Sequence, residues 1–484
     1  MTQPNKHGGP GEAAPPMPSG PGGGPPDPAG GPPPGGGPPP WAVPGPDRRS
    51  IRAALARLAV PMVLAEVIGL LVVVGVQALL GRMDGDALYV RALYMPVASL
   101  FLALFIAFDI SNQVAAAINR GRGRPQDVVP MALSFSRMWL AFISALIVVL
   151  ALVAPLLADA LLVPPSSHDH FVSFVRWMAL AELTYVGVVL CASSLRGFGH
   201  ARHSAAVMLV GAGVQFGGVW ALGIGAGMGA SSVPLSIALS SVVGLALGLF
   251  FLRRTGLWRP GQPKPWQPDA VRHLRQVGLP VATTQVILFG SNLVLLRVLG
   301  VFDPTVVSAY SGASSLQILV LMPGIVLGSA TAIVLNQQRG AGKAEWLPGT
   351  LRAGLEIAIG TYVVLGVAVW AASGPLGSLM SDVPEVSHQT ALYLGTIGLT
   401  YVLQGPVLSS LNIMEQIGSG LVAVLLNIFY YVVIVVASAL VVAAVHDPVA
   451  FYRTVALANL AGITVVVAVV VVVRRASRIE SGQP

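Results

Sequence analysis

The sequence has little charge. Only 10 % of its 484 residues are Asp, Glu, Lys or Arg, whereas 54 % are hydrophobic. A soluble globular domain carries about 25 % charged residues, so the composition predicts an integral membrane protein. The mean hydropathy of +0.75 agrees with this interpretation. The single cysteine, Cys191, excludes a disulfide within one chain and a cysteine-based metal cluster.

The sequence also lacks the patterns of an enzyme. No group of histidine, cysteine or carboxylate residues has the spacing of a metal site, and no nucleophile motif occurs. The glycine-rich basic segments do not match the phosphate-binding pattern G-x-x-x-x-G-K-[ST]. We therefore expect no enzyme and no resident cofactor. The net charge of +8 belongs to loops that set orientation in a membrane, so nucleic acid is not an expected partner.

Long apolar runs fill most of the chain. Each is near or above the roughly 20 residues that a helix needs to cross a bilayer, and unpaired backbone groups are not tolerated in lipid. The sequence therefore predicts an all-α integral membrane protein with twelve transmembrane helices. The segments are 58–80, 93–118, 131–155, 171–195, 204–226, 233–252, 277–299, 308–335, 350–372, 389–411, 419–444 and 450–473.

The chain contains an internal duplication. The basic segment Arg120–Arg124 closes the second apolar run and returns 219 residues later as Arg339–Lys343, and Pro61 recurs at the same spacing as Pro280. A second echo, at a spacing of 216, relates 183–195 to 399–411. Six segments fall in each repeat. Because six is even, both repeats enter the membrane in the same sense, which predicts two six-helix lobes related by a pseudo-two-fold axis along the membrane normal.

Basic residues concentrate on one set of connections, so the positive-inside rule places both termini in the cytoplasm of a cell-membrane protein. Proline and glycine dominate the first 47 residues, which cannot bury a core and lack the apolar region of a signal peptide. We expect a disordered cytoplasmic tail at 1–47, an N-terminal lobe at 48–255, a cytoplasmic linker at 256–276, a C-terminal lobe at 277–476 and a tail at 477–484.

Four motifs follow one another in order. They are Leu58-Ala59-Val60-Pro61 with 81–88 after it, Arg120–Arg124, Leu195-Arg196-Gly197-Phe198-Gly199, and Gly278-Leu279-Pro280. Together with the duplication, they resemble the multidrug and toxic compound extrusion (MATE) family, part of a wider superfamily of polysaccharide and lipid flippases. The resemblance covers residues from about 50 to 476. It implies a secondary transporter that exports organic, often cationic, compounds in exchange for protons or sodium by alternating access.

The chain departs from the family pattern at the ion-coupling acids. The family commonly carries an Asp late in the first segment, where this chain has Val76, and an acid with an Asn in the fifth, near Gly211 and Gln215. A family variant has a Glu in the seventh segment, near Leu288 here. The coupling ion, a proton or sodium, therefore cannot be carried over from the resemblance.

Three acids lie inside apolar segments, where an ionisable side chain costs roughly 2.5–3.5 kcal/mol on insertion scales. Glu66 and Asp109 lie at similar depth on successive segments, and Glu182 is near the middle of the fourth. We hypothesise that these three form a proton or cation site in the first lobe only. The alternative is that each acid pairs with a nearby arginine or a backbone group. Their repeat counterparts are uncharged: Gln285, Gly328 and Gly398.

Uncharged polar residues in the spans are candidates for the substrate cleft, with interhelical hydrogen bonding as the alternative. We select those of the first, second, seventh and eighth segments: Gln77, Asn112, Gln113, Gln285, Asn292 and Gln317. Outside this set, Arg352 and Glu356 are four residues apart and predict a local ion pair.

The expected partners are a small organic substrate, a coupling cation and membrane lipid. For the proline-rich tail, a passive role is favoured over binding of a protein partner. Two other functions stay open. A flippase for a lipid-linked saccharide would need a strongly cationic cleft. A membrane scaffold that does not transport would depend on the tail.

Overall fold

The computed structural model describes residues 43–482, apart from 84, 162 and 262. The expected tail at 1–47 therefore lies almost wholly outside the described residues. Within them, twelve helices are long and apolar enough to cross a membrane, as predicted for a multi-pass membrane protein. Residues 43–484 form one compact unit. The boundaries between the lobes at 255 and 277 stay predictions.

The first lobe contains six long helices in chain order. They are α1 (Arg48–Leu80), α2 (Gly85–Gly121), α3 (Val128–Ala160), α4 (Pro165–Gly197), α5 (Ala201–Gly218) with its π-helical continuation η2 (Val219–Gly225), and α6 (Ser232–Arg254). Two short 3₁₀ turns, η1 (Pro125–Asp127) and η3 (Gly229–Ser231), precede α3 and α6.

The second lobe also has six spans, four of them assembled from several elements. The seventh span combines α7 (Asp269–His273), η4 (Leu274–Gly278) and α8 (Leu279–Leu299). The eighth is α9 (Pro304–Gly340). The ninth is η5 (Ala344–Trp346) with α10 (Leu347–Ala371), followed by the short α11 (Ser373–Met380). The tenth combines α12 (Pro384–Ile397), η6 (Gly398–Thr400) and α13 (Tyr401–Gln416). The eleventh is α14 (Gly420–Val445). The twelfth combines α15 (Pro448–Ala458), η7 (Asn459–Gly462) and α16 (Ile463–Ser481).

Most helices extend beyond the apolar segments predicted from the sequence. The 33 residues of α1 correspond to about 50 Å, whereas the hydrocarbon core of a bilayer is about 30 Å thick. The seventh span begins at Asp269 instead of residue 277, which shortens the expected linker. Hydropathy cannot predict these extra turns, because they carry polar residues and are stabilised by helix continuity and packing.

α2 and α9 end in the same way, at the two copies of the repeated basic segment. In both, a glycine with positive φ follows the helix, Gly123 (φ 66°) and Gly342 (φ 69°). The next amide donates five residues back, from Arg124 to Asn119 and from Lys343 to Gln338, at 2.9 Å in each case. This is the Schellman arrangement, in which glycine avoids the penalty that a Cβ atom pays at positive φ. The repeat is therefore preserved in three dimensions.

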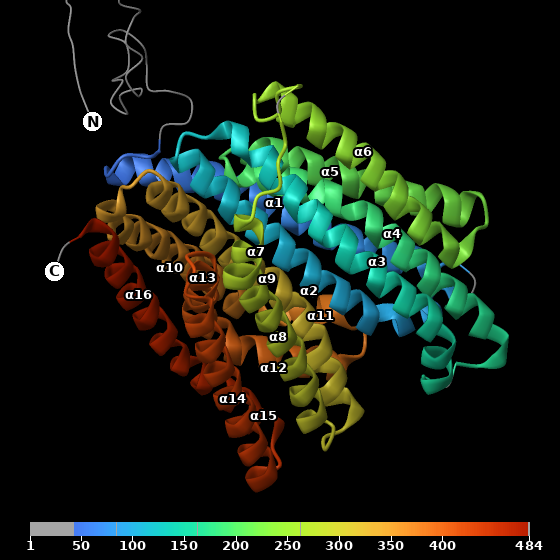
Figure 1. The fold of residues 1–484 in the computed structure, drawn as a ribbon. Coiled ribbons are helices and arrows are strands. Elements are labelled where there is room, and N and C mark those ends of the chain that lie inside the picture. Colours follow the sequence, from blue (N-terminus) through green and yellow to red (C-terminus); the bar gives the residue numbers. More distant parts are fainter. Residues whose placement is uncertain (1–42, 84, 162, 262, 483–484) are drawn as a thin grey trace, which may run out of the picture. The chain divides into compact units, whose positions relative to one another are not determined.

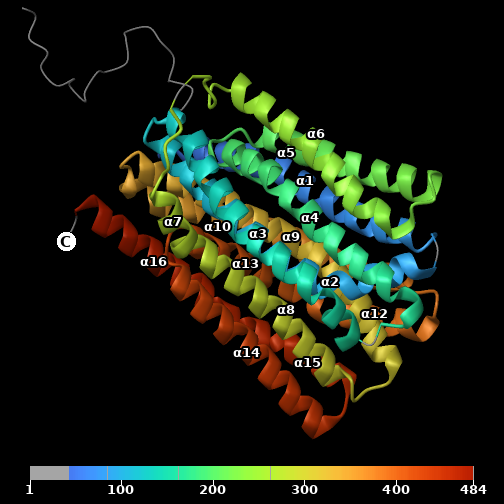
Figure 2. The same cartoon turned by 45° about the vertical axis from the view of Figure 1, so that its right-hand side comes forward.

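The two lobes are packed together at one end, which we call the basic end: the end where α1 begins and α2 and α9 finish. There, α1 and α2 lie against α9, and both views show these helices within the bundle (Figures 1 and 2). The backbones meet closely, because a Cβ atom on Gly121 would lie 2.0 Å from the carbonyl oxygen of Gln337, and one on Gly340 would lie 2.3 Å from that of Ile118.

The apolar clusters show the same asymmetry. One cluster at the basic end contains residues of both lobes, including Leu55 and Leu58 of α1 with Ile333 and Val334 of α9. By contrast, the cluster at the opposite end of the first lobe takes all its described members from that lobe. The lobes are therefore joined at the basic end and not by a shared core at the other.

Candidate functional site

An ion pair joins α2 to α4 inside the first lobe. Arg196, in the last turn of α4, donates from Nη2 to Oδ2 of Asp109 over 2.5 Å. The side chains are 8 % and 22 % exposed, so the pair is largely shielded from solvent. Close by, the amide of Asn112 donates to the hydroxyls of Ser193 and Ser194 at 2.8 and 2.9 Å. These bonds fix α2 against α4 and so position the ion pair.

Glu66 of α1 lies near the same ion pair. Its side chain is solvent-accessible although protein surrounds it, and Arg196 and Asp109 are the charged groups that act on it. Tyr185 of α4 is within electrostatic range of Glu66, Asp109 and Glu182. The three acids selected from the sequence therefore lie in the same region of the first lobe as Tyr185.

Glu182 has a basic neighbour of its own, Arg91 near the start of α2. The guanidinium of Arg91 lies 5.9 Å from the centroid of the Tyr94 ring. Its Nε and Nη1 atoms are buried and form no hydrogen bond with a described residue. Two arginines thus lie near three acids in the first lobe. For Asp109, the alternative of an acid paired with an arginine applies, because its carboxylate is bonded to Arg196.

Gln113 connects this ion pair to the second lobe. It is fully buried, and its Oε1 accepts a hydrogen bond from Nε of Arg196. Its Nε2 donates to Oγ of Ser329 on α9 and to Oε1 of Gln416 on α13, both at 2.8 Å. Gln416 in turn donates to Oδ1 of Asn412. A continuous chain of polar contacts therefore runs from Asp109 across the lobe interface to α13.

Further contacts hold the lobes together near the basic end. Nε2 of Gln337 donates to the carbonyl oxygen of Gly197 at 2.9 Å. The predicted Arg352–Glu356 pair is confirmed at 3.0 Å, and Glu356 also accepts from Arg52 of α1 at 2.8 Å. What looked like a local pair within one helix is thus also a bridge between lobes.

The candidate cleft residues separate into different environments. Asn112 and Gln113 are fully buried, so in this conformation they hold helices together and line no open space. Gln317 of α9 donates to Gln404 at 3.4 Å inside the second lobe. The other three are half-buried, and their side chains form no hydrogen bond with another described residue: Gln77, Gln285 and Asn292.

Sequence reasoning missed a buried acid in the second lobe, Glu415, which is 3 % exposed. The sequence predicted a proton site in the first lobe only, because the three acids there have uncharged counterparts in the second lobe. Glu415 weakens this prediction, because it is a buried acid in the second lobe. The 216-residue spacing aligned the end of the fourth segment with the wrong residues of the tenth. At the 219-residue spacing, Glu415 corresponds to Arg196, which would have identified both residues.

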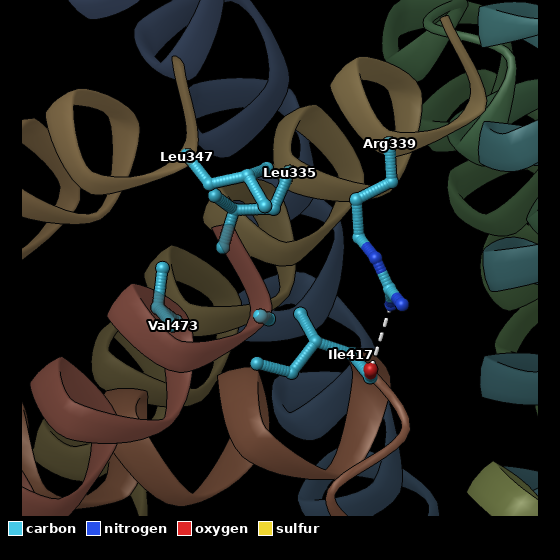
Figure 3. A pocket seen from close by; sticks show the side chains of 6 residues that line it. Leu335, Arg339, Leu347, Ile417 and Val473 are labelled. Atoms are coloured by element: carbon cyan, nitrogen blue, oxygen red, sulfur yellow. Dashed lines mark hydrogen bonds between the residues drawn. The ribbon is translucent and has the colours of Figure 1, made fainter. Parts of the chain in front are cut away.

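A small recess in the second lobe has no counterpart in these predictions. Leu335, Leu347, Ile417 and Val473 line it, and Arg339 borders it while donating to the carbonyl oxygen of Ile417 at 2.7 Å (Figure 3). Its volume is about 10 Å³, which is room for a single water molecule. It is therefore not a substrate site.

Comparisons with known proteins agree with this architecture. The MatE family model matches residues 280–441. A stretch of 175 residues is 24 % identical to a probable multidrug resistance protein NorM of Aromatoleum aromaticum. That stretch covers 34 % of this chain and 38 % of the relative, so the chain matches well under half of the relative's length.

Solved structures match over most of the chain. The Vibrio cholerae MATE transporter VcmN in its bent form has a TM-score of 0.82 at 14 % identity, over 90 % of this chain and 99 % of that one. An outward-facing multidrug resistance MATE transporter gives 0.81 at 16 % identity, over 88 % and 97 %. A transporter of the MOP superfamily from Pyrococcus furiosus, described as having a binding pocket of reverse polarity, gives 0.80 at 16 % identity, over 88 % and 96 %.

Proposed function

We propose that this chain, which belongs to the MATE family, exports small organic compounds, cationic or amphiphilic, in exchange for protons. The proposal draws on the family match and on the acids gathered in the first lobe. Protons are favoured over sodium because the acids interact with arginine and tyrosine side chains. No group of three or more His, Cys, Asp or Glu suited to hold a metal ion occurs among the described residues.

The observation that carries the proposal is the chain of contacts from Asp109 through Arg196 and Gln113 to Gln416. Protonation of Asp109 would remove the charge that balances Arg196. Loss of one partner from a buried ion pair costs about 3–5 kcal/mol. Inverting a two-state equilibrium from 1:99 to 99:1 needs about 5.5 kcal/mol. One proton at Asp109 is therefore of the right size to shift the lobes.

Glu66 supplies a second partner for the arginine. It lies within electrostatic range of both Arg196 and Asp109, and no described residue donates a hydrogen bond to it. When Asp109 takes up a proton, Arg196 can turn to Glu66, which pulls α4 toward α1 and weakens the contact with Gln113. In this mechanism, a proton at Asp109 is linked to separation of the lobes at the basic end.

The polarity of the site favours export of small organic compounds over flipping of a lipid-linked saccharide. A flippase needs net positive charge to hold a pyrophosphate. Arg91 and Arg196 face the acids Glu182 and Asp109, with Glu66 in addition. When ionised, the three acids outnumber the two arginines, which suits an organic cation better than a pyrophosphate.

Transport of a fluorescent organic cation into everted vesicles tests the proposal. A pH gradient and a sodium gradient are imposed in turn, and we expect only the pH gradient to drive uptake. Asp109→Asn and Glu66→Gln should abolish it at normal expression, whereas Asp159→Asn, at a side chain that is 71 % exposed, serves as the matched control. Wild-type rates in both variants, or uptake driven by sodium alone, would overturn the proposal.

A further inference from the structure

The buried carboxyl of Glu415 lies in the last turn of α13. The hydroxyl of Thr284, on α8, donates to its Oε1 at 2.5 Å. Among the described residues, no other side chain bonds to the carboxyl, and no charged group acts on it. Glu415 is therefore an acid inside the protein with one neutral partner and no counter-charge.

The charged groups on the helices packed around α13 are engaged elsewhere. Arg339 of α9 pairs with Glu480 of α16 at 2.5 Å, and Glu356 of α10 pairs with Arg52. Arg120 of α2 donates to the carbonyl oxygen of Phe198 at 2.6 Å. Other charged residues on these helices have no electrostatic influence on Glu415 either: Asp109 of α2, Arg275 of η4, Arg297 of α8, and Arg474, Arg475 and Arg478 of α16.

The repeat explains why this acid stands alone. The turns after α4 and α13 have the same form, with amide bonds from His200 to Leu195 at 2.7 Å and from Ser419 to Met414 at 3.0 Å. This places Glu415 at the position of Arg196 in the first lobe. There, Arg196 meets Asp109 and Glu66. The counterparts in the second lobe carry no charge: Gly328 and Gln285.

An isolated carboxylate in a low-dielectric interior is strongly destabilised, and the group neutralises itself by holding a proton. The site offers one carboxyl and one hydroxyl, whereas a metal ion such as Ca²⁺ requires six or more oxygen ligands. A proton is therefore the ligand that fits.

Access to the site is one-sided. At the basic end, the chain after α13 packs tightly on the start of α8: a Cβ atom on Gly420 would lie 2.4 Å from Cγ of Pro280 and 3.0 Å from the carbonyl oxygen of Gln276. On the other side, Thr284 and Gln285 are only half-buried. Thr284 is thus the bonded neighbour of Glu415 on the less tightly packed side.

We propose that Glu415, held by Thr284, is a second proton-binding site of this protein, located in the second lobe. Its role in transport rests on the proposed function: a proton taken up there would leave at the basic end when the lobes separate and the bond between Gln416 and Gln113 opens. Glu415 directly precedes Gln416, which bonds to Gln113 across the interface. Both lobes then carry a proton site beside the same junction.

Infrared difference spectroscopy of the purified full chain, titrated from acid to alkaline pH, tests the site without substrate or gradient. The wild type should show a protonated carboxyl band at neutral pH that is lost in Glu415→Gln and retained in Asp109→Asn. Thr284→Val should shift the band and its titration midpoint. Thr283→Val is the matched control, because that hydroxyl donates to the carbonyl oxygen of Leu279 instead.

A proton count gives an independent readout. Acidification of the protein from alkaline to mildly acidic pH should bind one proton fewer in Glu415→Gln than in the wild type. Equal counts, or identical spectra of wild type and Glu415→Gln, would overturn the site. Because neither measurement involves transport, a failure of export in vesicles refutes the proposed function and leaves the result at Glu415 unaffected.

Discussion

Replacement of Gln113 by leucine should open the basic end. The leucine side chain has a similar volume but cannot bond to Ser329 or Gln416, the two contacts that cross the lobe interface at 2.8 Å. The variant also loses the bond from Arg196 to Gln113. That bond lies within the first lobe, so its loss affects the closed and the open conformation equally. Only the two crossing bonds therefore change the balance between the closed and the open basic end.

The expected size follows from these two bonds. A typical intramolecular hydrogen bond contributes about 1 kcal/mol net, so their loss favours the open conformation by about 2 kcal/mol. At 1.4 kcal/mol per factor of ten, this raises the ratio of open to closed molecules roughly 30-fold. Burial strengthens the effect, because Ser329 and Gln416 would be left unsatisfied only in the closed conformation.

Distances between spin labels can measure the ratio. The single native cysteine is buried, so Cys191→Ala provides a background without accessible thiols. Labels at Arg202→Cys and Glu345→Cys occupy exposed positions on different lobes at the basic end. Double electron–electron resonance then gives the populations of short and long distances.

A matched control separates loss of the crossing bonds from loss of a buried amide. Gln404 is 7 % exposed, and its bonded partner lies in the second lobe, so Gln404→Leu should leave the distance distribution unchanged. An unchanged distribution in Gln113→Leu, or an equal shift in Gln404→Leu, would refute the role assigned to the bridge.

Three further predictions concern closure and pH. Gly340→Ala should push the lobes apart and reduce export at least tenfold, because the added Cβ would lie 2.3 Å from the carbonyl oxygen of Ile118 and overpacking costs about 1–3 kcal/mol. The control variant Gly349→Ala should transport normally, because its added Cβ meets nothing within 4 Å. Glu356→Gln should raise the open population in the label measurement and remove its dependence on ionic strength, and an unchanged salt response would contradict the bridge. Burial and nearby basic groups lower the pKa of His200 to about 4. The unfolded chain therefore takes up a proton there below about pH 6.5 and the folded protein does not, so stability falls from about pH 6.5 to about pH 4, and melting curves of His200→Gln should show a weaker fall.

Much of the fold could be predicted from the sequence, because the constraint is local. Lipid requires about 20 consecutive apolar residues with internally satisfied backbones, so hydropathy identifies each span without knowledge of its neighbours. The positive-φ glycines Gly123 and Gly342 follow from the same kind of local rule. Helix ends such as Asp269 were missed because polar turns outside the bilayer leave no hydropathy signal.

The candidate site was predictable only in part. Insertion cost singles out Glu66, Asp109 and Glu182 from the sequence, since each charge in an apolar run stands out. Their common neighbour, Tyr185, gave no such signal, because an aromatic residue in a span is ordinary. Arg196 gave no such signal either, because it follows the apolar run of the fourth segment, although its side chain is 8 % exposed and bonded to Asp109.

By itself, the sequence determined the number of spans, their duplication and the presence of acids in the membrane, because each depends on the chemistry of one segment in lipid. Only the tertiary structure decided which charges meet, that Gln113 joins the lobes, and that Glu415 lacks a counter-charge. Those facts depend on residues 80 to 300 positions apart that are placed within hydrogen-bond distance by helix packing. Pairing over such distances leaves no periodicity in the chain, and so it had to be observed in space.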